Sequence, residues 1–190
     1  MSFTLLGILN SQAAGGAAGA YDLLETTILT SPASSVTFSG LDAYSDYKHL
    51  QIRATVSQTD NQHHYKMYVN GDTTAGKYRS HYLFGNGSSV SSDATTIPYF
   101  EIYYGSPRLG GSYPNSAGAL VTDILDFSNT SKNTTIRSIA GFHQDTNLGQ
   151  GLSLNSGAWF DTAAVTSFSL KPTQTGNWTT NCRFSLYGVK

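Results

Sequence analysis

Carboxylates are the side chains of this sequence that could act as general acids, bases or nucleophiles, and their spacing selects no catalytic site. Glu25 and Glu101 are the only glutamates and lie far apart, and nothing singles out a pair among the aspartates. Cleavage of a glycosidic bond needs two carboxylates about 5–10 Å apart. Asp123 and Asp126, three residues apart on an expected strand, point to opposite faces. We therefore expect no catalytic residues and no enzymatic activity.

Histidine and cysteine offer little for a metal or a covalent mechanism. His63 and His64 are adjacent, so on extended backbone their side chains diverge, and a shared metal would need a turn and further ligands. The single Cys182 has no partner for a disulfide, and its surroundings show no pattern of a reactive thiolate. Nucleotide-binding and nucleophile motifs are absent from the sequence. We expect a small buried cysteine, no bound metal and no cofactor.

Tyrosines are the most suggestive recognition residues. Tyr99, Tyr103, Tyr104 and Tyr113 gather around the loops that follow two prolines. An exposed tyrosine is a rigid, amphipathic contact surface in the recognition of proteins or sugars. Packing within a strand face is the alternative interpretation of the same four residues.

Composition excludes two classes of partner. The chain has 190 residues and a net charge of −1, and only 12% of its residues are charged. Its Lys and Arg are scattered singly, without the basic stripe that nucleic-acid binding requires. No run of about 18 apolar residues exists that could span a bilayer. We expect neither nucleic acid nor a membrane as a partner.

Alternation of apolar and polar residues with a period of two dominates the sequence and predicts strands. In residues 48–57, Leu50, Ile52, Ala54 and Val56 alternate with polar neighbours, and an Asn70-Gly71 turn is expected to join two strands as a hairpin. Helical spacing is almost absent. The predicted fold is an all-β, antiparallel two-sheet sandwich, jelly-roll-like. The expected strands are residues 23–29, 35–38, 48–57, 65–69, 78–84, 97–104, 119–127, 134–143, 152–160, 165–170 and 178–189.

The first twenty residues differ from the rest and predict an extended N-terminal arm (1–20) ahead of the sandwich domain (21–190). A Gly/Ala tract at residues 13–20 has no large side chains with which to pack, whereas the tip is apolar. We expect the tip to be buried on a neighbouring subunit. A frayed terminus is the alternative. The expected anchoring residues are Phe3, Leu5, Leu6, Ile8 and Leu9.

Six short motifs occur in a specific order and spacing between residue 21 and residue 189. They are residues 21–26 (YDLLET), 33–38 (ASSVTF), 47–53 (YKHLQIR), 69–72 (VNGD), 85–88 (GNGS) and 184–189 (FSLYGV). Together they resemble tailed-bacteriophage virion structural proteins. The resemblance implies a jelly-roll-like sandwich on a virion, either as a capsid decoration (cement) protein or in a tail fibre or knob, commonly as a trimer.

The expected function is that of a non-enzymatic capsid decoration protein, assembled in the bacterial host cytoplasm and located on the capsid surface. Its expected partners are the major capsid protein and copies of itself, in a homotrimer whose arms connect neighbouring chains. Attachment at several sites would strengthen weak individual contacts through effective concentration. The alternative is a tail-fibre or knob adhesin that binds a bacterial surface glycan through tyrosine and asparagine side chains in its loops.

Overall fold

The computed structural model describes residues 19–59, 63–105, 107, 116–145 and 149–190. In these ranges strands dominate, and the one helical element is a short 3₁₀ turn, η1 (Leu41–Tyr44). The strands are β1 (Tyr21–Ile28), β2 (Val36–Ser39), β3 (His49–Val56), β4 (Tyr65–Val69), β5 (Tyr78–Gly85), β6 (Val90–Thr95), β7 (Phe100–Ile102), β8 (Gly118–Leu125), β9 (Thr134–Asp145), β10 (Gly149–Trp159), β11 (Ser167–Pro172) and β12 (Arg183–Val189).

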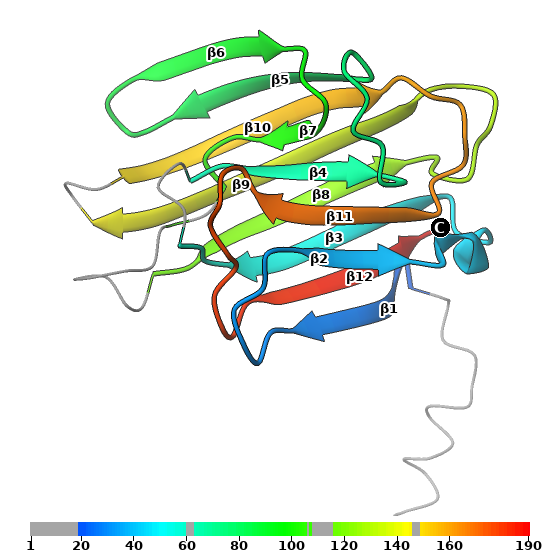
Figure 1. Cartoon of the computed structure of the whole chain (residues 1–190), viewed down its shortest axis with the longest axis horizontal. Coiled ribbons are helices and arrows are strands. Elements are labelled where there is room, and N and C mark those ends of the chain that lie inside the picture. Colours follow the sequence, from blue (N-terminus) through cyan, green and yellow to red (C-terminus); the bar gives the residue numbers. More distant parts are fainter. Residues whose placement is uncertain (1–18, 60–62, 106, 108–115, 146–148) are drawn as a thin grey trace, which may run out of the picture.

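The strands form two antiparallel sheets that pack face to face (Figure 1). The larger sheet has the order β1-β12-β3-β8-β9-β10-β5-β6, and the smaller has the order β2-β11-β4-β7. Eight strands are paired as in one long hairpin rolled up: β1 with β12, β2 with β11, β3 with β8, and β4 with β7. This is jelly-roll topology. The predicted all-β, two-sheet sandwich is confirmed, and its expected arm lies mostly outside the described residues.

Two insertions make the sheets unequal. The pair β5–β6 enters between β4 and β7, and the pair β9–β10 enters between β8 and β11; all four strands extend the larger sheet. As a result β5 and β6 project beyond β7, the edge strand of the smaller sheet (Figure 1). The alternating pattern did not reveal β6, because its residues are mostly small, polar and exposed.

The turn at Asn70 and Gly71 has the expected backbone conformation, but the two strands that it joins do not pair with each other. Both residues have positive φ, 52° and 68°, and Asp72 N–H donates to the carbonyl of Val69 at 2.9 Å. The predicted hairpin is nevertheless wrong, since β4 joins the smaller sheet and β5 the larger. The Asn70 side chain explains the crossing, because it bonds the segment before β11, accepting from Thr166 N–H at 2.8 Å.

The core lies between the sheets and is built from the inward residues of both. Trp178 is fully buried in this core, where its ring contacts Tyr65 and Phe184 edge-on and its N–H donates to a backbone carbonyl at 3.1 Å. Cys182 is also buried, as expected of a small core residue. Its thiol donates a hydrogen bond to the backbone carbonyl of Ser57. Within the described ranges, no helix has the length and apolar character needed to cross a membrane.

Candidate functional site

Polar side chains of the larger sheet hold the edge strand of the smaller one. The hydroxyl of Ser80 (β5) accepts from Glu101 N–H at 3.1 Å, and the side-chain oxygen of Asn155 (β10) accepts from Tyr103 N–H at 2.9 Å. The hydroxyl of Ser153 donates to the Tyr103 carbonyl. An edge strand has backbone groups without ladder partners, and burying such groups unpaired is costly. Polar residues are therefore required on the inner face of the larger sheet opposite β7.

This requirement decides which face of β10 is buried. Ser153 and Asn155 are fully buried, whereas Leu152 and Leu154 are 63% and 45% exposed. The same arrangement extends to β9, where Ser138 is buried and Ile139 exposed, because neighbours across a sheet share a face. Alternation alone would place the leucines inside. In the structure the aliphatic residues of these strands point to the outer surface.

The outer surface of the larger sheet consequently carries an apolar patch, called here the aliphatic face. In one row across four strands, Val121, Ile139, Leu154 and Leu83 stand directly opposite one another. Each of the side chains in the patch is at least 40% exposed. Large contiguous apolar patches at the surface of a globular protein mark contact sites. The aliphatic face consists of Leu83, Val90, Val121, Ile139, Leu152 and Leu154.

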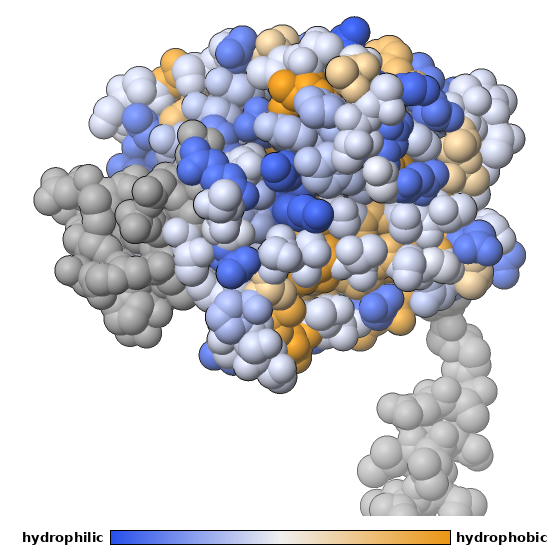
Figure 2. All heavy atoms as spheres, in the orientation of Figure 1, coloured by the Kyte–Doolittle hydropathy of each residue, from blue (hydrophilic) through white to orange (hydrophobic). Residues whose placement is uncertain are grey.

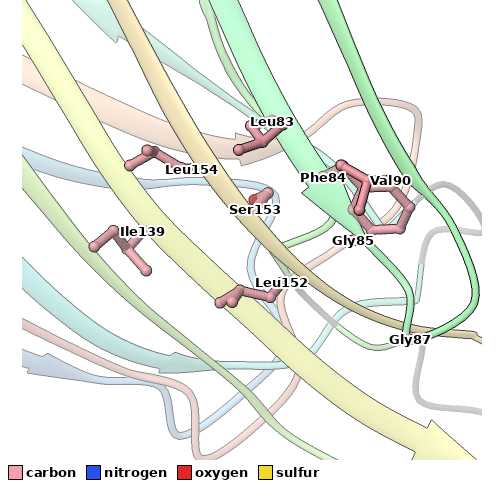
Figure 3. Close-up of a pocket in the computed structure, with 9 residues that line it drawn as sticks. All are labelled: Leu83, Phe84, Gly85, Gly87, Val90, Ile139, Leu152, Ser153 and Leu154. Carbon is pink, nitrogen blue, oxygen red and sulfur yellow. The ribbon is translucent and has the colours of Figure 1, made fainter.

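A hollow of about 510 Å³ lies within the aliphatic face (Figure 3). Its walls are Leu83 of β5, Ile139 of β9, and Leu152 and Leu154 of β10, and Figure 3 shows Val90 at one end. Leu152 is paired with a glycine on both sides, Gly141 in β9 and Gly85 in β5. Because these glycines have no side chain, the surface of the sheet is depressed on both sides of Leu152.

Charged residues stand beside the hollow rather than in it. The next row of the sheet contains Arg137, which forms an ion pair with Asp123 at 2.9 Å, and Gln51, which donates to the same carboxylate at 2.7 Å. Within β8, β9, β10, β5 and β6, the two rows that form the hollow contain no charged side chain, and Arg53 of β3 stands at their margin, opposite Val121. The other side of the molecule, where the smaller sheet lies in front (Figure 1), has a different surface. Figure 2 shows this side as mostly polar, with small scattered apolar areas. The hollow is therefore suited to an uncharged, apolar ligand or segment.

A second cluster, of aromatic side chains, lies where β5 projects beyond β7. Tyr82 and Tyr103 stack in parallel with ring centroids 3.8 Å apart. Tyr104 packs on Phe84 at 4.3 Å, and the His64 ring lies 4.1 Å from that of Tyr103. Most of these rings are half-buried, so the cluster presents edges and hydroxyls at the surface. Such half-exposed rings are suited to contacts with sugars or proteins.

Burial and neighbouring groups raise the pKa of two tyrosines of this aromatic cluster, Tyr103 and Tyr104. Burial, the Tyr82 hydroxyl and the negative charges of Glu101 and Asp93 raise the pKa of Tyr103 to about 12. His64 Nδ1 lies 3.1 Å from Glu101 Oε1, in a pair with little exposure. The cluster thus offers hydrogen-bond donors and carboxylates beside apolar rings.

The predicted recognition residues fall into separate places. Tyr103 and Tyr104 belong to the aromatic cluster, whereas Tyr99 packs against Tyr68, whose strand lies in the smaller sheet, with the Lys66 ammonium 5.3 Å from its ring. Tyr113 lies outside the described residues. The predicted arm anchors lie there too: Phe3, Leu5, Leu6, Ile8 and Leu9.

The aliphatic face is the feature that sequence reasoning missed. The sequence signal for it lies in residues 152–155, Leu-Ser-Leu-Asn, where apolar and polar residues alternate as regularly as in a strand that faces a core. Alternation identifies two faces but not which one is buried. The buried Ser153 and Asn155 of β10 become intelligible only once the chain at β7 is placed opposite them.

Comparisons with known proteins provide no family for the chain. No protein-family model matches it, and no curated protein does. One similar solved structure is the crystal structure of Caenorhabditis elegans galectin LEC-6, with 7% sequence identity and a TM-score of 0.29. The match covers 87% of this chain and 95% of the galectin. A likeness this weak bears no weight for function.

Proposed function

We propose that this chain is a non-enzymatic structural protein of a tailed-bacteriophage virion, a capsid decoration protein that works as an assembly of several copies. The observation that carries the proposal is the aliphatic face, six exposed aliphatic residues on a rigid sheet. A chain that keeps Leu152 and Leu154 outside and Ser153 and Asn155 inside has a surface that is completed by another polypeptide.

Decoration of a shell needs binding, not chemistry, and the architecture suits it. A protein bound only to the closed shell stabilises that shell in proportion to RT ln(1 + [L]/Kd). A homotrimer that contacts the major capsid protein at three points multiplies a weak individual contact through effective concentration. Because the aliphatic face lacks charge, its contacts depend little on salt. The N-terminal arm would connect one copy with the next.

Copy number in purified virions tests the location. Quantitative protein staining against the major capsid protein should give hundreds of copies per particle, and labelled protein should lie over the capsid in electron micrographs. A handful of copies at the tail would instead indicate a fibre. Complete absence from particles would refute the virion proposal.

Surface variants test whether the aliphatic face binds the capsid. Leu154→Asp places a charge in the hollow and should abolish binding of the purified protein to undecorated capsids. Ser156→Asp is the matched control, since Ser156 is exposed two residues along β10, outside the aliphatic face. Equal capsid binding by both variants would contradict a role for this face.

A second candidate function, adhesion to a bacterial surface glycan, is favoured by the aromatic cluster. Stacked Tyr82 and Tyr103 beside a His64–Glu101 pair combine the apolar faces, donors and carboxylates that bind sugars. A glycan array probed with the pure protein should then give a signal that Tyr82→Ala removes and Tyr99→Ala retains. A blank array would leave decoration as the supported function.

A further inference from the structure

We propose that the hollow in the aliphatic face receives the apolar segment of residues 3–9 from a neighbouring copy of this chain. The inference names the partner of that face, and it rests on the proposed function in one respect, that the chain works as an assembly. It can be tested without capsids.

The chemistry of the two surfaces matches. Residues 1–19 contain no Asp, Glu, Lys, Arg or His, and residues 3–9, Phe-Thr-Leu-Leu-Gly-Ile-Leu, include five large apolar side chains. Within β8, β9, β10, β5 and β6, the rows that form the hollow contain no charged side chain, and their large exposed side chains are aliphatic. An uncharged, apolar segment gains most by leaving water and loses no solvated charge when it does so. Charged groups lie only at the margin of the aliphatic face, in the Arg137–Asp123 pair and in Arg53 of β3, which stands opposite Val121.

The length of the chain before β1 limits which hollow the segment reaches. β1 is one edge of the larger sheet, and β10 lies five strands away, about 24 Å at the usual strand spacing. Tyr21 aligns with His49, whereas Leu152 lies at the level of Thr55, which adds about 20 Å along the strands. The path within one chain is therefore about 31 Å, by combining these two distances.

The tether between Leu9 and Gly19 is poorly matched to that path. Ten residues span at most about 33–36 Å when fully extended. A Gly-rich tether of this length has a typical end-to-end distance of only about 17 Å. Reaching the hollow of its own chain would require a nearly straight tether, at a high entropic cost. A neighbouring copy placed beside β1 offers its hollow within the ordinary reach of the tether.

An arm passed from each copy to the next makes a head-to-tail contact, which joins two different surfaces. Such contacts close into a ring when the rotation between copies allows it. A closed ring of three copies would use every arm and cover every hollow. This gives the expected homotrimer a specific physical contact.

Cysteine cross-linking tests the contact directly in the full-length protein. One preparation carries Leu6→Cys and a second, of distinguishable mass, carries Leu154→Cys, both with Cys182→Ala. After mixing, subunit exchange and mild oxidation, we expect a disulfide-linked heterodimer as the main product. The control replaces Leu154→Cys with Thr55→Cys, an exposed site three strands from β10 on the same sheet, and should give little. Equal yields from both would overturn the proposal.

A chain carrying both Leu6→Cys and Leu154→Cys separates the two possible routes of the arm. Linked oligomers support the proposal, whereas a disulfide confined to one chain would show that the arm covers its own sheet and would overturn it.

Charge exchange provides an independent readout by sedimentation. Leu6→Glu and Leu154→Lys should each weaken self-association at least about tenfold, and an equimolar mixture of the two should regain much of it. If Leu154→Lys weakened association while Leu6→Glu did not, two sheets would be packing face to face and the arm would have no role. If the link forms but virions lack the protein, only the proposed function fails.

Discussion

The side-chain oxygen of Asn155 accepts a hydrogen bond from the backbone N–H of Tyr103 at 2.9 Å, and this contact joins the two sheets at the edge of the smaller one. Asn155 is fully buried and also donates to Ser153 at 2.9 Å. Together with the bond from Glu101 N–H to Ser80, the Asn155–Tyr103 contact gives the backbone at the edge strand β7 partners in the opposite sheet. Because side chains alternate along a strand, the leucines of β10 then face outward.

Removing this contact should destabilise the fold. Asn155→Ala leaves the partly buried Tyr103 N–H without its partner, which should cost about 1 kcal/mol or more. Urea unfolding followed by tryptophan fluorescence measures the loss. Ser156→Ala, an exposed change one residue away, should stay within about 0.5 kcal/mol of the parent. An unchanged midpoint for Asn155→Ala would mean that β7 is not held in this way.

Two leucines on neighbouring layers should respond in opposite ways. Leu170 in β11 is fully buried, so Leu170→Ala should lower the free energy of unfolding by about 2–5 kcal/mol. Leu154→Ala should change it by less than about 0.5 kcal/mol when the protein is dilute and monomeric. Chemical denaturation at low concentration compares them. A similar large loss for Leu154→Ala would place that side chain in a core.

Acid stability should depend on the contact between the first and last strands. Hydrogen bonds from Lys190 Nζ, at 2.7 Å, and from the Tyr47 hydroxyl, at 2.9 Å, lower the pKa of Asp22. A carboxyl whose pKa is lower in the folded state stabilises the fold above its unfolded pKa, about 3.9, and this contribution disappears as the pH falls through the folded pKa.

Asp22→Asn should therefore make the decline of stability below about pH 4 shallower than in the parent. Thermal unfolding between neutral and acidic pH provides the measurement. Tyr47→Phe retains the lysine bond and should lie between the two. Parallel pH profiles for the parent and Asp22→Asn would exclude this contribution.

Because the sheets are closely packed at Gly157 of β10, a larger residue at this position should destabilise the fold. A Cβ at Gly157 would overlap the carbonyl of Arg79 and lie 2.9 Å from the Phe100 ring. Gly157→Ala should cost about 1–3 kcal/mol, the usual penalty for overpacking. Gly85→Ala is the control, because a Cβ there meets nothing closer than 3.9 Å. Equal melting temperatures for the two variants would contradict this packing.

The strands themselves could be predicted with good accuracy. The segments expected at residues 48–57, 65–69 and 134–143 correspond to β3, β4 and β9 within two residues at each end. The expected strand at 97–104 is shorter, since Pro98 precedes it and Tyr104 turns to positive φ. The candidate site was harder to predict, because Tyr103 and Tyr104 meet rings from β5 and β9 that are distant in sequence.

Local physical chemistry in the sequence determined the all-β class, the positions of most strands and the backbone of the Asn70-Gly71 turn. These properties depend on near neighbours: alternation, turn residues and the lack of helical spacing. Only the tertiary structure decided that β4 and β5 belong to different sheets and that Leu152 and Leu154 lie outside. A strand with period two can bury either face, and the choice here followed from the backbone of Tyr103, directly after β7, which is bonded by Ser153 and Asn155 opposite it.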